Sequence, residues 1–128
     1  EFSIHYGQYL AESVVCRQCG HTYVTHHEKM TDVNIAMELL SDAFSDRFDV
    51  ALLVSADSDL VGPIQKVRAL FPRKRVIVVF PPARHSNNLQ RAANASLHLD
   101  RATLAQSVFP DQVVKSDGFV LYRPARWQ

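Results

Sequence analysis

The chain has little of what marks an exported or membrane-spanning protein. Its only two cysteines, Cys16 and Cys19, form one Cys-x-x-Cys, a spacing more typical of a metal knuckle or a redox pair than of a secreted disulfide framework. No apolar run approaches the roughly 20 residues that cross a bilayer, and the N-terminus lacks the basic and apolar regions of a signal peptide. These absences predict a cytoplasmic protein.

An excess of either charge is also missing. Lys and Arg number 14 against 13 Asp and Glu, a formal net charge of +1, so any affinity for nucleic acid must come from a local patch. The sequence contains no internal repeat or low-complexity segment. Its 128 residues suffice for a single core that buries about two-thirds of the unfolded surface. We expect one domain over residues 1–128.

What the sequence does contain is a buried strand that ends in acids. Residues 50–54 are five consecutive apolar residues, too short for a lone helix and without polar alternation, so they predict a strand covered on both faces. Such strands belong to parallel α/β sheets, in which ligands bind beyond the carboxyl ends of the strands. Asp57 and Asp59 follow this strand at its carboxyl end.

Further elements of an α/β fold are predicted along the chain. Apolar residues at helical spacing predict helices over residues 31–47, with Thr31 as N-cap, and over residues 60–70. Residues 76–80 predict a second apolar strand, which completes a right-handed βαβ unit. Before these elements, the sequence predicts a strand over 2–10 and a hairpin that pairs 13–15 with 22–25. After them it predicts a helix over 86–95 capped by Ser86, a strand over 96–99 and a helix from Asp100. The last predicted element is a hairpin that pairs 112–115 with 119–123.

Asp32 is a third acid at the same predicted edge, because the start of a helix that precedes a parallel strand lies near the carboxyl ends of the strands. Mg²⁺ and Mn²⁺ prefer oxygen ligands and usually combine a few carboxylates with substrate phosphate, which favours phosphodiester chemistry. Asp32, Asp57 and Asp59 are therefore the candidate metal ligands and catalytic residues. The alternative is that Asp57 and Asp59 are turn residues, with Ser58 or Asp59 as the N-cap of the next helix.

Polar and basic residues at the same predicted edge are the candidate substrate contacts. They are Lys29, Asn34, Ser55, Arg84, Ser86 and Asn87. Backbone donors at a helix start near Ser86 would also suit a phosphate. Ordinary roles as capping, strand-ending and first-turn residues are the alternatives. The basic residues 73–75 precede a strand, so we expect a solvated loop at the opposite edge.

The segment Cys16-Arg-Gln-Cys19-Gly20 resembles one knuckle of a zinc ribbon. Three histidines lie close enough in sequence to be further ligands, namely His21, His26 and His27. A structural zinc normally takes four ligands, and the chain has no second Cys-x-x-Cys. A structural Zn²⁺ site, a reducible disulfide and two free thiols therefore all remain open.

Two acidic motifs in a fixed order give the chain a family resemblance. Residues 28–36, Glu-Lys-Met-Thr-Asp-Val-Asn-Ile-Ala, and residues 54–60, Val-Ser-Ala-Asp-Ser-Asp-Leu, resemble the NYN family of LabA-like domains in the PIN-like nuclease superfamily. The resemblance implies a Rossmann-like, three-layer α/β fold with a parallel sheet. It also implies a ribonuclease that uses Mg²⁺ or Mn²⁺ held by Asp32, Asp57 and Asp59, with RNA as the substrate.

The family also opens with a strand that bears an Asp, and no such strand precedes Phe2. We therefore expect the chain to be the C-terminal portion of a longer domain, and its sheet to be completed in a homo-oligomer or by strand exchange. The leading hypothesis is a metal-dependent endoribonuclease. A non-catalytic RNA-binding or protein-interaction module with an incomplete metal site is the alternative. An aspartyl-phosphate phosphohydrolase ranks last, since Lys115 is the only lysine after Lys74.

Overall fold

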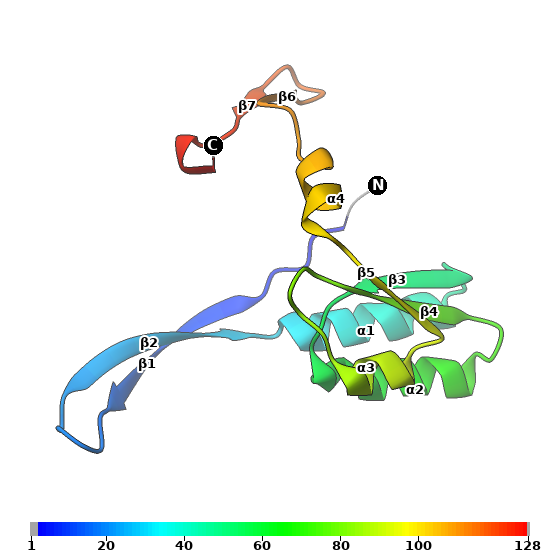
Figure 1. Cartoon of the computed structure of the whole chain (residues 1–128), viewed down its shortest axis with the longest axis horizontal. Coiled ribbons are helices and arrows are strands. Elements are labelled where there is room, and N and C mark those ends of the chain that lie inside the picture. The colour runs from blue at the N-terminus through cyan, green and yellow to red at the C-terminus, as the bar shows by residue number, and fades with distance from the viewer. Residues whose placement is uncertain (1–2, 128) are drawn as a thin grey trace.

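The computed structural model describes residues 3–127 and has a parallel three-stranded sheet at its centre (Figure 1). The strands β3 (Val50–Val54), β4 (Arg75–Phe80) and β5 (Ala95–His98) lie in that order, so β4 is the central strand. The register pairs Leu52 with Ile77 and Ile77 with Ala95. The predicted parallel α/β core is confirmed.

Three helices cover one face of this sheet. They are α1 (Thr31–Phe44), α2 (Val61–Leu70) and α3 (Asn87–Ala92), and Figure 1 shows them on the same side. Ile64 and Val67 of α2 and Leu89 of α3 are fully buried, as are Val76 and Val78 of β4. Two successive βαβ crossovers of the same hand, in the same direction along the sheet, place their helices on one face.

The opposite face of the sheet is apolar, and it is exposed along β3 and at Leu97 of β5. Val50, Leu52 and Val54 of β3 and Leu97 of β5 keep 48%, 64%, 57% and 54% of their surface exposed, whereas Leu53, which faces the helices, keeps 9%. Within the described part of the chain, β3 pairs with β4 alone. The described residues thus form two layers, with helices on one face of the sheet.

A two-stranded arm extends away from the core (Figure 1). Its strands β1 (Gln8–Val15) and β2 (Thr22–Lys29) are antiparallel and pair along their whole length. The predicted hairpin is confirmed and is longer than expected. The strand predicted over residues 2–10 is wrong for residues 3–7, because β2 ends opposite Gln8 and leaves them without a partner; residue 2 lies outside the described part.

The boundaries of α1 differ from those predicted. Met30, with a left-handed φ of 78°, is the N-cap, and the hydroxyl of Thr31 instead donates to the carboxylate of Glu28. The helix ends at Phe44 rather than near residue 47, since Asp46 adopts a φ of 55° that a right-handed helix cannot continue through. The arm and the core are therefore joined by a sharp turn at Met30.

Lys74 corrects the prediction of a solvated basic loop over residues 73–75. Its side chain is buried, with 7% of its surface exposed. The ammonium group donates to the carboxylate of Asp46 and, at 2.6 Å, to the carbonyl oxygen of Phe48, whose ring centroid lies 5.2 Å away. These partners compensate the charge, so this lysine ties the end of α1 to the start of β4.

The C-terminal part projects from the core on the side of the sheet away from α1–α3 (Figure 1). It comprises α4 (Arg101–Gln106), β6 (Gln112–Val114), β7 (Val120–Tyr122) and a short 3-10 helix, η2 (Ala125–Trp127). Asp100 caps α4 by accepting from the N–H of Thr103 at 2.6 Å, and the predicted terminal hairpin is confirmed.

Among the residues described, no helix is both long and apolar enough to cross a membrane.

Candidate metal centre

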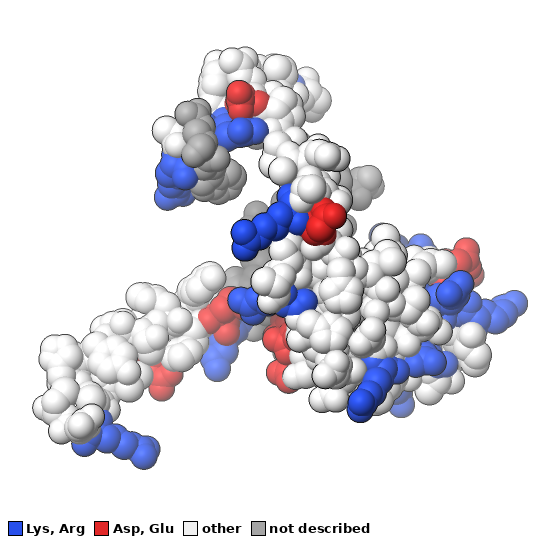
Figure 2. All heavy atoms as spheres, viewed as in Figure 1, with Lys and Arg blue, Asp and Glu red and all other residues white. Residues whose placement is uncertain are grey.

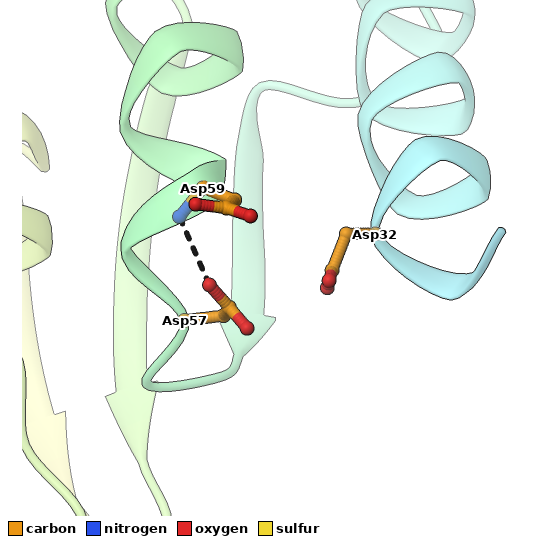
Figure 3. A group of neighbouring side chains, drawn as sticks. All are labelled: Asp32, Asp57 and Asp59. Carbon is orange, nitrogen blue, oxygen red and sulfur yellow. Dashed lines mark hydrogen bonds between the residues drawn. The ribbon is translucent and has the colours of Figure 1, made fainter. Parts of the chain in front are cut away.

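Three aspartates converge beyond the carboxyl end of β3 (Figure 3). Asp32 is the second residue of α1, Asp57 follows β3, and Asp59 lies in the 3-10 helix η1 (Ser58–Leu60). Each side chain offers one carboxylate oxygen, and the three oxygens lie within 4.8 Å of one another. Figure 3 shows the carboxylates of Asp57 and Asp59 on the side that faces Asp32.

The loop after β3 is held in place by its own hydrogen bonds. The Oγ of Ser55 accepts from the N–H of Asp57 at 3.0 Å, and Oδ1 of Asp57 accepts from the N–H of Asp59 at 3.0 Å. Leu60 is buried in the core and anchors the end of the loop. Asp57 is thus the N-cap of η1, and the expectation that Ser58 or Asp59 would be the cap is wrong, because the extended backbone of Asp57 starts the turn one residue earlier.

The role of Asp57 as an N-cap is compatible with a second role as a metal ligand. The cap occupies only Oδ1, and a carboxylate has a second oxygen for a cation. The N–H of Asp59 also fixes the orientation of the Asp57 carboxylate, so the cap positions a ligand instead of replacing it. An aspartate in this place can both start a helix and bind a metal.

Electrostatics fits a cation at this point. Burial raises the pKa of Asp32, and the negative charges of Asp57, Glu28 and Asp59 raise it further. In the described part of the chain, no ion pair with Lys, Arg or His involves Asp32, Asp57 or Asp59. Because the three carboxylates repel one another without a compensating side chain, a divalent cation would relieve the repulsion.

The residues predicted as substrate contacts have different surroundings. Ser55 holds the Asp57 loop, as described above, while the amide of Asn34 donates to the carbonyl of Tyr6 at 3.2 Å and so holds the segment before the arm. The hydroxyl of Ser86 accepts from the N–H of Leu89 at 3.3 Å and caps α3. Lys29, at the end of β2, and Arg84, in the loop after β4, have exposed side chains.

A pair of histidines lies at the carboxyl ends of β4 and β5. The Nδ1 of His85 and the Nε2 of His98 are 3.2 Å apart, and the Nε2 of His85 lies 3.0 Å from the Oδ1 of Asn87. Both rings pack on Phe80, with centroid distances of 4.5 and 5.1 Å. Sequence reasoning missed His98, although its place at the end of a predicted parallel strand could have identified it.

Cys16 and Cys19 are both free thiols in the turn between β1 and β2. This turn is the far tip of the arm (Figure 1). The acidic cluster begins at Asp32, just after the base of the arm. The two groups of candidate metal ligands are therefore separate sites.

Comparisons with known proteins agree with the fold. The NYN domain family matches residues 8–100. A crystal structure of a protein of unknown function, VPA0982 from Vibrio parahaemolyticus RIMD 2210633, is similar with a TM-score of 0.52 and 22% identity, over 70% of this chain and 51% of that one. The chain thus spans about half the length of that protein. No curated protein matches the chain.

Proposed function

Because the chain belongs to the NYN domain family, we propose that it is a divalent-metal-dependent ribonuclease domain that hydrolyses phosphodiester bonds in RNA. The observation that carries this proposal is the convergence of Asp32, Asp57 and Asp59, whose oxygens lie within 4.8 Å of one another. Two separate elements, α1 and the loop after β3, are needed to bring these side chains together. Helix capping accounts for one oxygen of Asp57, and the dipole of α1 favours an acid in its first turn, but neither effect requires the three carboxylates to converge.

The donor set fits Mg²⁺ or Mn²⁺, since it consists of carboxylate oxygens alone and is open to solvent. Asp32, Asp57 and Asp59 would hold the ion, which when bound supplies an activated water and neutralises charge on the phosphate. The chain itself holds these metal ligands in position. The first turn of α1 fixes Asp32, while the N–H of Asp59 and the hydroxyl of Ser55 fix the loop of Asp57.

Exposed basic side chains at this edge are the proposed contacts for RNA phosphates. Lys29 ends the arm just before α1, and Arg84 follows β4, one strand away from the acidic loop. On the face of the molecule that Figure 2 shows, basic side chains are dispersed rather than joined in one stripe. A few local phosphate contacts, together with a bound cation, would therefore carry the affinity for RNA.

Cleavage of a labelled single-stranded RNA tests the proposal. We expect products with Mn²⁺ or Mg²⁺, none in EDTA, and none from DNA of the same sequence. Asp57→Asn should lower the rate by at least about 100-fold, since even residues that only support metal ligands contribute 10- to 100-fold. Metal-independent cleavage, or full activity of this variant, would reject the proposal. Retention of RNA without turnover would favour the non-catalytic RNA-binding alternative.

We also propose that a second copy of the chain covers the exposed face of the sheet. Val50, Leu52 and Val54 are exposed on the edge strand β3, and Leu97 is exposed on the same face of β5, with Ile77 and Val79 of β4 between them. A two-fold axis through this face would bury the same side chains of both copies. Full burial of one aliphatic side chain is worth about 1.5–3 kcal/mol, so even these half-exposed residues offer a substantial gain.

A further inference from the structure

The turn at the tip of the arm is closed by backbone hydrogen bonds. The N–H of Cys16 donates to the carbonyl of His21 at 2.8 Å, and the N–H of Gly20 donates to the carbonyl of Cys16 at 2.9 Å. Gly20 has a φ of 71°, which allows the chain to return into β2 without the strain that a larger residue would incur. The closed turn holds both cysteines on one short loop.

Backbone donors favour a thiolate in this turn. The N–H groups of Cys19 and Gln18 donate to the sulfur of Cys16 and, with the Cys19 thiol, lower the pKa of the Cys16 thiol. Hydrogen bonds to the charged form stabilise it, and the thiolate is the form that binds metal.

The chain itself supplies only two ligands at this place. Within residues 3–127, no third His, Cys, Asp or Glu side chain joins Cys16 and Cys19 in a cluster that could hold a metal. His27 faces Glu12 across the arm, with Nε2 and Oε2 3.5 Å apart. A structural zinc site closes with four protein ligands, and the described residues supply two of them at this turn.

We propose that two copies of the chain share one Zn²⁺ at the tips of their arms, with Cys16 and Cys19 of each copy as ligands. The arm extends away from the core, so the turn is accessible to another copy (Figure 1). Charge also favours two identical turns. Four thiolates around Zn²⁺ leave a net charge of −2, and the Arg17 of each turn supplies one positive charge.

The binding step changes no oxidation state. Four thiols lose their protons to the solvent, and four zinc–sulfur bonds form around the ion. A two-fold axis through the metal relates the two arms, as is usual in homodimers. The site is independent of the proposed ribonuclease function, because it uses no residue of the acidic cluster.

Zinc titration of the whole reduced chain tests this inference. We expect one Zn²⁺ per two chains, a doubling of the mass of the metal-free species by light scattering, and reversal by EDTA. Co²⁺ in place of Zn²⁺ should give the sulfur-to-cobalt charge-transfer absorption of a tetrahedral thiolate site. Because that absorption requires thiolates, Co²⁺ bound by carboxylates does not contribute to it.

Three variants separate the shared site from its rivals. The double variant Cys16→Ser, Cys19→Ser should lose the absorption and the doubling of mass, whereas Asp57→Asn should keep both even if RNA cleavage is lost. His21→Ala should also keep both. One zinc per chain without a change in mass, loss of the site in His21→Ala, or no zinc binding by the reduced chain would overturn the inference.

Discussion

Replacement of Asp57 by Asn should have opposite effects on stability with and without metal. Asn is about as good an N-cap as Asp, so its side-chain oxygen can still accept from the N–H of Asp59, which Asp57 binds at 3.0 Å. The variant therefore removes one negative charge and keeps the local hydrogen bond. In metal-free buffer the loss of repulsion should stabilise the fold, and with metal the loss of a ligand should remove a stabilising interaction.

The size of the metal-free effect follows from the geometry of the cluster. Two unit charges 4.8 Å apart, the upper limit for these oxygens, repel by about 0.9 kcal/mol in a water-like dielectric. Asp57 faces two such charges, and physiological salt with a screening length of about 8 Å roughly halves the effect. Asp57→Asn should thus gain about 1 kcal/mol, or about 4 °C in Tm.

Thermal unfolding in EDTA and in Mn²⁺ measures both effects. At a Mn²⁺ concentration about 100 times its Kd, the wild type should gain about 2.7 kcal/mol, and the variant should gain little. Asp117→Asn is the matched control, because Asp117 also accepts from the N–H two residues on at 3.0 Å but lies 3.4 Å from Lys115. A lower Tm of Asp57→Asn in EDTA, or an equal Mn²⁺ effect in both chains, would refute the reasoning.

Three further predictions concern other charged and apolar groups. Burial and the neighbouring carboxylates raise the pKa of Asp32 above its unfolded value, so its ionised form costs stability at neutral pH. Metal-free Asp32→Asn should then unfold at a higher temperature than the wild type at pH 7, and this difference should vanish as the pH falls below about 3.9, the unfolded-state value. Lys74→Met leaves the carbonyl of Phe48 without its donor and should cost about 1–3 kcal/mol in urea denaturation, whereas Arg73→Gln, at an exposed position, should cost little. Leu52→Lys should reduce self-association in EDTA, as measured by light scattering. Met37→Lys is the control and should not reduce it, because Met37 lies on α1 and is 62% exposed, compared with 64% for Leu52. Equal association of both variants would show that the sheet face is not the interface.

The strands and their acids were predictable because their pattern is local. Continuous apolar runs at residues 50–54 and 76–80 indicated buried parallel strands, and the geometry of a βαβ unit then placed Asp57 at the carboxyl edge. The same geometry brought Asp32 to that edge from a separate helix. Convergence of the three acids thus followed from topology, without knowledge of any side-chain contact.

Features that depend on long-range contacts were not predictable. Lys74 was expected in solvent, because nothing in the sequence shows that Asp46 and the carbonyl of Phe48 meet it from the other side. The exposure of one face of β3 was not predictable for a similar reason. An apolar run indicates that both faces suit burial, but the run does not show which layer covers each face, and the described helices cover only one.

The base of the arm links the hairpin to the acidic cluster. Met30 makes the turn between β2 and α1 with its left-handed φ of 78°, and Asp32 follows two residues later. Gly7 packs against this turn so closely that a Cβ would lie 2.6 Å from the Oγ1 of Thr31 and 3.1 Å from the carbonyl oxygen of Lys29. A larger residue there would push against the Thr31 side chain, next to Asp32, and against the backbone of Lys29, so Gly7 lets the segment before the arm pass close to the start of α1.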